Sequence, residues 1–300
     1  MIDFHAPELS DKTRVDAAFL TGNCRSDDYC FGNIYIWRAF YKTRIAFWDD
    51  MPLIAFDDGP NGAARYLFPL GDGNVKEALQ ALAREPDARR PFTLAGVTED
   101  MKKQLEELFP GRFSFQLNRE QSDYVYSVEA LTNLAGRKYH GKRNHLARFK
   151  RKDWEYEVIT PQNIEVCDKF NDEWCAVNDY QNSPALLAEY KAVKEAFASF
   201  EKLGFAGGLL RQEGRPVAFT IGEPICKDTY GIHIEKAFAD VEGAYAAINR
   251  EFLAASCAAY TYVNREEDVG DEGLRKAKLS YHPVELLDKY TATLTGGETL

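Results

Sequence analysis

Apolar and polar residues alternate along this chain in short segments, some with a helical period near 3.6 residues and some with a strand period of two. A break at Asp49-Asp50-Met51-Pro52 separates two apolar strands and predicts a hairpin. The first half thus predicts, in order, a helix near Ser10–Leu20, an apolar-rich segment at Gly32–Tyr41, strands at Arg44–Trp48, Leu53–Phe56 and Arg65–Phe68, a helix from about Asn74, a strand at Phe92–Ala95, a helix at Glu99–Phe109 and a strand at Phe113–Leu117.

The second half repeats this order. It predicts helices from Pro161 to about Tyr180 and at Ala185–Lys202, strands at Phe205–Arg211, Pro216–Gly222 and Thr229–Glu235, a helix at Gly243–Ala258, a strand at Tyr260–Val263, a helix at Asp271–Ser280 and a strand near Val284–Thr293. Both halves read α-α-β-β-β-α-β-α-β. We therefore predict an α/β (α+β) fold made by tandem duplication of one module, with residues 1–127 and 128–300 as the two copies.

The composition is that of an ordinary soluble globular protein, with 45% hydrophobic and 28% charged residues. No apolar run approaches the ~18 to 20 residues that a membrane span needs, and the N-terminus lacks the regions of a signal peptide. We expect a cytoplasmic protein without a transmembrane segment. The cysteines form no C-x-x-C pair and no histidine lies at ligand spacing from them, so we expect neither a metal site nor disulfides.

One segment departs from the acidic character of the chain, whose net charge is −10. Residues 137–152 contain eight lysines and arginines and no acid. A solvated helix face is one interpretation, but like charges at i, i+4 destabilise a helix, and phosphates would supply the missing countercharge. The acceptor stem of a tRNA or an anionic membrane surface would fit. The residues expected to contact phosphate are Arg137, Lys138, His140, Lys142 and Arg143.

A second charged segment, Asn264 to Pro283, follows the strand that ends at Val263. After Asn264 and Arg265 come five acids, then three bases, then Tyr281. Because buried charge is costly unless it is paired, so dense a cluster beside a strand end favours a functional site over a core. A solvated loop and helix start is the alternative.

The hairpin Gly207–Ile221, with Gly214 in its turn and V-A-F in its second strand, resembles the central hairpin of the acetyltransferase (GNAT) fold. That resemblance implies mixed, mostly antiparallel sheets flanked by helices. It also implies a donor site where a strand and loop lead into a helix that opens with Gly243, Ala244 and Tyr245, since a helix N-terminus binds anions. Gly243 would let the donor approach the backbone closely. Asn249 and Arg250 lie just inside this helix and could face the donor.

The segment Ala277-Lys278-Leu279-Ser280-Tyr281 resembles the A-x-x-x-Y of the last GNAT helix, which implies that Tyr281 protonates the leaving group. A core tyrosine is the alternative. Asn264 could donate to the oxyanion. A base could come from Glu235, Glu266, Glu267 or Asp268, and Glu266 is favoured because alternation places it on the same side as Asn264. His233 lies in a strand and could be a base, although a satisfied core histidine is the expectation. The cations that could hold an acidic donor or acceptor, or pair with the preceding acids, are Arg275, Lys276 and Lys278.

The chain resembles the C-terminal, catalytic domain of phosphatidylglycerol lysyltransferases in three features taken together: the two-module order, the charged segment Asn264–Pro283, and the basic stretch R-K-Y-H-G-K-R-N-H-L. The related Fem-type aminoacyltransferases also use paired GNAT-like modules. The resemblance implies an acyltransferase that uses aminoacyl-tRNA as donor, holds no tightly bound cofactor, and acts on a lipid head group or a small amine. Two alternatives stay open, an N-acetyltransferase that uses acetyl-coenzyme A and a non-catalytic module that binds RNA or a membrane surface.

Overall fold

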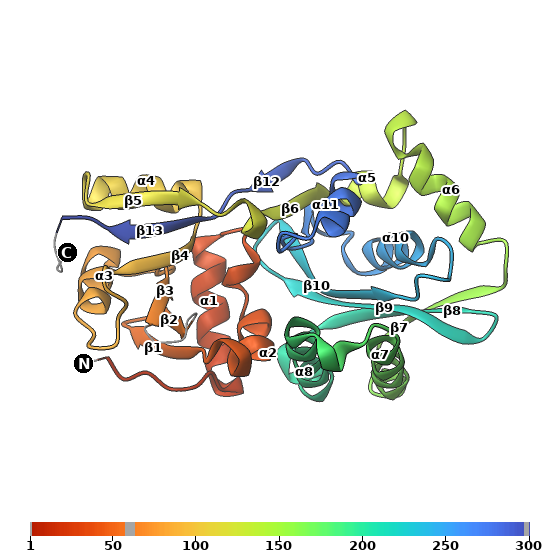
Figure 1. Ribbon diagram of the computed structural model, residues 1–300, viewed down its shortest axis with the longest axis horizontal. Coiled ribbons are helices and arrows are strands. Elements are labelled where there is room, and N and C mark those ends of the chain that lie inside the picture. The colour runs from red at the N-terminus through yellow and green to blue at the C-terminus, as the bar shows by residue number, and fades with distance from the viewer. Residues whose placement is uncertain (1, 58–63, 297–299) are drawn as a thin grey trace.

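In the computed structural model, which describes residues 2–57, 64–296 and 300, two mixed β-sheets lie side by side, each flanked by helices (Figure 1). The pairs β3–β4 and β10–β11 are parallel, and the other pairings between named strands of the described chain are antiparallel. The predicted α/β architecture with mixed, mostly antiparallel sheets is confirmed.

The first half follows the predicted order of elements. It comprises α1 (Lys12–Gly22), α2 (Phe31–Tyr41), β1 (Arg44–Trp48), β2 (Met51–Asp57), β3 (Ala64–Leu67), α3 (Val75–Ala83), β4 (Thr93–Val97), α4 (Glu99–Leu108) and β5 (Phe113–Leu117). Local chemistry sets its boundaries. The Asn74 side chain caps α3 by accepting from Glu77 N at 3.2 Å, for example.

The second half shows the same order. It comprises α7 (Ile164–Val177), α8 (Pro184–Ala198), α9 (Phe200–Leu203), β8 (Ala206–Gln212), β9 (Arg215–Pro224), β10 (Thr229–Ala237), α10 (Ala244–Ser256), β11 (Tyr262–Asn264), α11 (Glu272–Leu279), β12 (Glu285–Leu287) and β13 (Tyr290–Leu294). The single strand predicted at Val284–Thr293 is wrong, because β12 and β13 belong to different sheets.

A connecting segment separates the two repeats. It contains β6 (Asp123–Ser127), α5 (Val128–Asn133), the basic helix α6 (His140–Phe149) and β7 (Trp154–Val158). The predicted boundary between the copies falls at the end of β6. In the structure the tyrosines and valine of β6 are fully buried, so this stretch is a core strand.

Each half contributes one strand to the other half's sheet. The first sheet has the order β1-β2-β3-β4-β13-β5 and the second has β12-β6-β11-β10-β9-β8-β7. The strand β13 thus lies between β4 and β5, and β6 lies between β11 and β12. A division after residue 127 therefore does not separate the two sheets.

The buried core also crosses between the halves. Its largest cluster includes Phe31 and Leu53 from the first half together with Phe170 and Phe219 from the second. A second cluster, with Tyr126 and Phe252, lies between the second sheet and the helices α5 and α10. The two sheets are thus parts of one packed body, with α7 and α8 on one face of the second sheet and α10 on the other (Figure 1).

Candidate active site

A cleft of about 300 Å³ opens where β10 leads into α10, at the helix N-terminus that the sequence singled out. Its wall is formed by the basic helix α6, the loop before α10, the first turn of α10 and Tyr281, which follows the end of α11. The lining residues are Lys142, His145, Phe238, Ala239, Val241, Glu242, Gly243, Ala244, Tyr245, Ala246 and Tyr281.

Gly243 sets the direction of α10 at this cleft. Its φ is +85°, in the left-handed region, and a Cβ there would lie 2.2 Å from the carbonyl oxygen of His145. Only glycine lets α10 pack so closely against α6. The residue was expected to allow a ligand to approach the backbone, but in the structure its bare Cα faces the neighbouring helix.

Tyr281 closes the cleft from the side of α11. Its side chain is buried, packs edge-to-face on Tyr126 with ring centroids 6.4 Å apart, and lies beneath the ammonium group of Lys142, 3.5 Å from its ring centroid. Burial raises the pKa of Tyr281 to about 12, although the nearby Arg265 guanidinium opposes this. The hydroxyl therefore stays protonated at neutral pH and can act as an acid.

Two cations converge on Tyr281. Burial, with a smaller contribution from Arg265, lowers the pKa of Lys142 to about 8. The Arg265 guanidinium lies 4.7 Å from the Tyr281 ring centroid and forms an ion pair of 2.6 Å with Glu235, which also accepts from Asn249 Nδ2 at 3.1 Å. Glu235 and Asn249 thus lie behind the cleft and orient Arg265. Sequence reasoning missed Arg265, although it lies between the two residues it did select.

Asn264 and Glu266 share a side, as alternation predicted, but that side faces the interface between the two halves. Both amide hydrogens of Asn264 are used, by Arg25 O at 2.8 Å and Asp123 Oδ2 at 2.9 Å. Glu266 Oε1 lies 2.8 Å from Nδ1 of His233. Neither residue lines the cleft, and Asn264 has no donor left for an oxyanion.

The remaining predicted donor-site cations are mostly held by the protein. Arg275 forms a bidentate pair with Asp268, with two contacts of 2.8 Å. Lys278 is buried and donates to Arg265 O at 2.6 Å. Arg250 donates to Thr132 O at 3.2 Å, and Lys276 is exposed on α11. Arg275 and Lys278 therefore fix the loop after β11, which was the alternative interpretation of these cations.

The basic segment divides into two parts. Acids from elsewhere in the chain pair with its C-terminal part, as Arg148–Glu242, Lys150–Glu251 and Lys152–Glu213.

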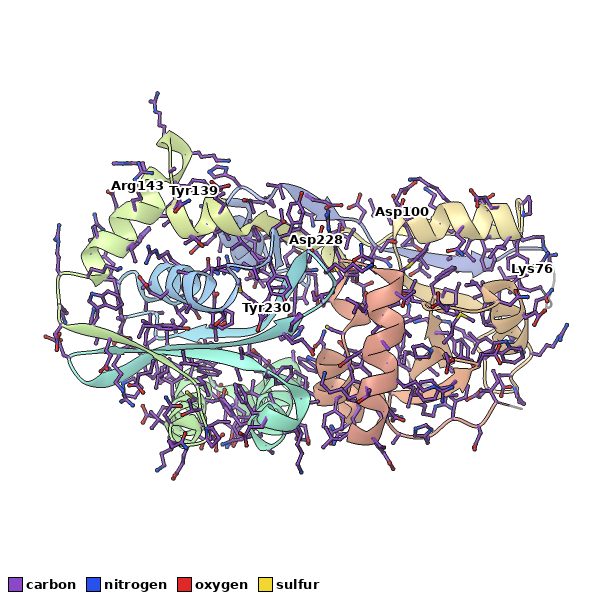
Figure 2. All side chains as sticks on the ribbon, turned by 180° about the vertical axis from the view of Figure 1, so that it is seen from behind. Lys76, Asp100, Tyr139, Arg143, Asp228 and Tyr230 are labelled. Carbon is purple, nitrogen blue, oxygen red and sulfur yellow. The ribbon has the colours of Figure 1, made fainter. Side chains whose placement is uncertain are left out.

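The N-terminal part keeps its charge available. Arg143 caps the preceding turn by donating to Leu134 O and Gly136 O, and Arg137, Lys138 and His140 are exposed. Within the described chain, neither Arg137, Lys138 nor Lys142 has an acid at ion-pair distance. Figure 2 shows Arg143 and Tyr139 at the end of the molecule that carries α6, away from Lys76 and Asp100 of the first half.

A buried ion cluster that the sequence did not predict joins the two halves. Lys289, which precedes β13, contacts Asp27, Asp28 (3.0 Å) and Asp123 (2.7 Å). Burial lowers the pKa of Lys289, but these three acids outweigh it and raise that pKa. The ammonium group therefore offsets part of the negative charge of the three acids, and it links the second half to the first.

None of the helices in the described part of the chain has the length and apolar character that a membrane span requires.

The family model of the phosphatidylglycerol lysyltransferase C-terminal domain matches residues 23–293 of this chain. Among curated proteins, no sequence matches it. A conserved protein of unknown function from Bacteroides thetaiotaomicron has a similar structure, with 40% identity, a TM-score of 0.93, and coverage of 98% of this chain and 100% of that one. L-PGS from Bacillus licheniformis is 16% identical with a TM-score of 0.58, and the match covers 85% of each chain.

The fold is also that of proteins with paired GNAT-like modules. FemX is 10% identical with a TM-score of 0.62 over 98% of each chain. A tandem GNAT protein from clavulanic acid biosynthesis is also 10% identical, with a TM-score of 0.50 over 99% of each chain. At such identity the likeness concerns the fold alone, and it confirms the predicted tandem GNAT-like architecture.

Proposed function

The chain belongs to the family of phosphatidylglycerol lysyltransferase C-terminal domains, and on this premise we propose that it transfers an aminoacyl group from aminoacyl-tRNA to an amine or hydroxyl acceptor. By family it is a transferase of acyl groups. The observation that carries the proposal is the cleft in which a buried tyrosine meets two cations at a helix N-terminus. The acceptor would be a lipid head group or a small amine.

In the proposed reaction, the acceptor attacks the ester carbonyl that joins the amino acid to the terminal ribose. The new bond to carbon forms as the carbon–ribose oxygen bond breaks, and Tyr281 gives its proton to the leaving oxygen. The proton lost by the acceptor restores the tyrosine. Lys142 and Arg265 stabilise the negative charge that develops, and the positive end of the α10 dipole faces the same cleft.

The exposed cations of the α6 region support tRNA as the carrier of the donor. Arg137, Lys138 and His140 lie beside Lys142 on the outer surface and have room for phosphates. A coenzyme A thioester is the alternative donor, favoured by the N-terminus of α10 and opposed by Glu242 in the cleft wall.

The first experiment measures binding of aminoacyl-tRNA at several salt concentrations, with acetyl-coenzyme A as competitor. We expect Lys142→Ala to weaken binding and to reduce the slope of log affinity against log salt by about 1, because one phosphate contact is lost. Lys152→Ala is the matched control, since Lys152 belongs to the same basic segment but pairs with Glu213. Equal slopes for the two variants would remove Lys142 from the binding surface.

The second arm measures transfer to amine and lipid acceptors. Tyr281→Phe should lower turnover by roughly 10²- to 10⁴-fold and leave tRNA binding unchanged, because only the proton donor is lost. Tyr126→Phe is the control, since its hydroxyl donates to Lys278 O at 2.9 Å. Unimpaired turnover of Tyr281→Phe contradicts the mechanism. Competition by acetyl-coenzyme A alone would assign the alternative donor, and RNA binding without transfer to any acceptor would indicate a binding module.

A further inference from the structure

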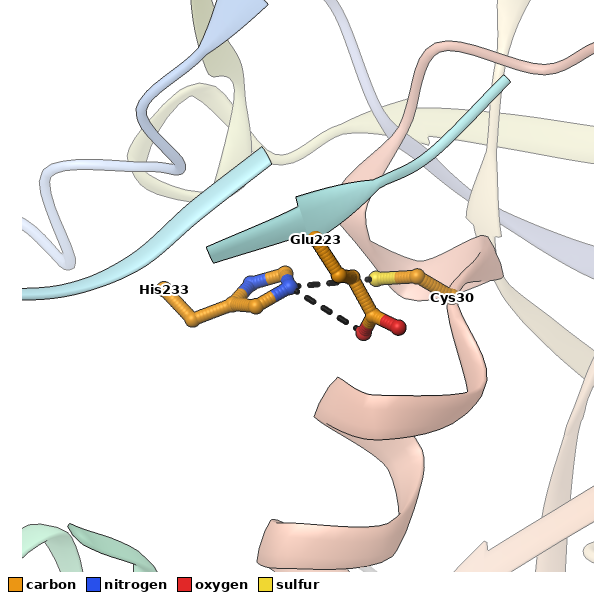
Figure 3. Close-up of side chains that lie close together, drawn as sticks. All are labelled: Cys30, Glu223 and His233. Carbon is orange, nitrogen blue, oxygen red and sulfur yellow. Dashed lines mark hydrogen bonds and ion pairs between the residues drawn. The ribbon is translucent and has the colours of Figure 1, made fainter. Parts of the chain in front are cut away.

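Three side chains of different chemistry converge at the interface between the two halves, away from the cleft. Cys30 precedes α2, Glu223 lies on β9 and His233 on β10 (Figure 3). His233 Nε2 lies 3.2 Å from Glu223 Oε1 and 3.7 Å from Cys30 Sγ. Their ligand atoms all lie within 4.8 Å of one another, so one ion could contact all three.

These separations fit a tetrahedral metal site. With zinc–sulfur, zinc–nitrogen and zinc–oxygen bonds of about 2.3, 2.0 and 2.1 Å, a tetrahedral ion holds sulfur and nitrogen about 3.5 Å apart and nitrogen and oxygen about 3.4 Å apart. The distances in the structure are 3.7 and 3.2 Å. Thiolate, imidazole and carboxylate are also the ligand types that zinc takes in proteins. We propose that Cys30, Glu223 and His233 bind a zinc ion.

The other nitrogen of His233 is already engaged as a metal ligand requires. Its Nδ1 lies 2.8 Å from Glu266 Oε1, the carboxylate–histidine arrangement that orients zinc-binding imidazoles. In this arrangement the ring keeps its proton on Nδ1 and presents the lone pair of Nε2 to the ion. This gives Glu266 a positioning role at the interface.

The backbone at His233 and at Glu266 departs from regular strand geometry. The pairing of β9 with β10 shifts register between Ile232 and Ile234, so His233 is the extra residue of a bulge. Such bulges re-aim a side chain. Glu266 has φ of +59°, a conformation that costs about 1–2 kcal/mol for a residue with a side chain. The regular pairing of β9 with β10 is therefore interrupted at His233.

Two other interpretations of the cluster explain less. A nucleophilic cysteine with a histidine base needs a substrate, but Cys30 and Glu223 are 4% and 3% exposed and neither lines the cleft. A protonated imidazole between Glu223 and Glu266 accounts for the carboxylates and leaves the Cys30 thiol bonded to Asp27 O at 2.9 Å, but it gives no reason for the sulfur to lie 3.7 Å from His233 Nε2. A metal ion uses all three side chains.

Zinc binding would exchange protons for the ion. Cys30 releases its thiol proton and becomes a thiolate, His233 releases any proton on Nε2, and no oxidant or reductant takes part. Since Cys30 comes from the first half and the other two ligands from the second, the ion would join the halves. This role is structural and does not depend on the proposed transfer reaction.

The test is metal content and cobalt spectroscopy of the full chain. Purified protein would be stripped with a chelator, titrated with Zn²⁺, and separately titrated with Co²⁺ to follow the absorbance of the cobalt–thiolate bond. We expect about one equivalent of zinc per chain and a cobalt–thiolate band in the wild type. Cys30→Ser should lose the band. Cys175→Ser should keep it, because this buried cysteine lies elsewhere and hydrogen-bonds Asn171.

A third variant tests the site without removing a ligand, so that a weaker site can be told from an unfolded protein. Glu266→Gln keeps all three ligands but removes the carboxylate behind His233, and zinc should bind about 10- to 100-fold more weakly. Circular dichroism would verify that each variant is folded. If the folded wild type shows no cobalt–thiolate band, or if Cys30→Ser shows an equal band, the zinc site is overturned. If Glu266→Gln binds zinc with unchanged affinity, the positioning role of Glu266 is overturned.

Discussion

Gly243 occupies the position that the resemblance assigned to it, but the need for glycine there has a different cause. The resemblance implied that a bare Cα would admit the donor, whereas the structure places the missing Cβ against His145 O of the basic helix. The glycine therefore fixes how α6 lies against α10, and through this packing it sets the position of Lys142 at the cleft.

We predict that Gly243→Ala is much more destabilising than Gly214→Ala. Both glycines have positive φ, which costs a side-chain residue roughly 1–2 kcal/mol. Only Gly243 adds a collision, at 2.2 Å, whereas a Cβ on Gly214 would meet nothing within 4 Å. The clash should add on the order of 1–3 kcal/mol. Urea unfolding of both variants measures the difference, and equal losses would show that α6 can move aside.

At the scale of elements, the charged segment after β11 is a loop and a helix that hold each other. Asp268 has a fully buried side chain and receives Arg275, Arg119 and the Tyr124 hydroxyl. Asp271 caps α11 by accepting from Leu274 N at 2.6 Å. Asp268, Asp271 and Arg275 therefore fix the shape of the segment itself, whereas Arg265 reaches Tyr281.

The stability of this loop should depend on pH through Asp268. The hydrogen bond from Arg275, with others from Tyr124 and Gly270, lowers the pKa of Asp268 below its ordinary value. A carboxyl whose folded pKa is depressed stabilises the fold above its unfolded pKa of about 4 and loses this contribution as pH falls further. Asp268→Asn should cost about 2 kcal/mol at pH 7 and flatten the decline in stability below about pH 4.

Urea unfolding between pH 2 and 7 would measure this effect, with Asp240→Asn as an exposed control that should match the wild type. A decline below pH 4 that is as steep in Asp268→Asn as in the wild type would assign the acid sensitivity to other groups.

At the scale of the whole molecule, the two repeats are interlocked. The strand that follows β5 completes the second sheet, and the strand that follows β12 completes the first. Lys289 lies at this crossing, where it forms ion pairs with Asp27, Asp28 and Asp123. The interface between the halves therefore consists of exchanged strands and buried ion pairs, and not of a surface contact between two separately folded domains.

We predict that neither repeat folds when it is expressed alone. Residues 1–127 lack β13, which hydrogen-bonds to both β4 and β5. They also lack Lys289, which forms ion pairs with Asp27, Asp28 and Asp123. Residues 128–300 lack β6, the partner of β11 and β12. Circular dichroism and urea unfolding of each fragment should show no cooperative transition. A cooperative transition in either one would mean that a sheet closes without its exchanged strand.

The local sequence was sufficient for most of the elements and for one side of the candidate site. Periodicity, caps and turns depend on neighbouring residues, so the repeated order of helices and strands and the opening of α10 could be predicted. Tyr281 and the Gly243-Ala244-Tyr245 turn were selected by the resemblance to the GNAT fold, and Lys142 by its place in a run of like charge. The structure gathers them around one cleft.

Tertiary structure alone decided the rest, because the contacts concerned join residues far apart in the chain. Alternation places Asn264 and Glu266 on one side and Arg265 on the other, but only the packing of α5, α11 and the first half determines which side is the cleft. The pairing of Lys289 with Asp27 and the approach of Cys30 to His233 each span more than 200 residues. Charge pairing and strand exchange depend on proximity in space, which no local pattern encodes.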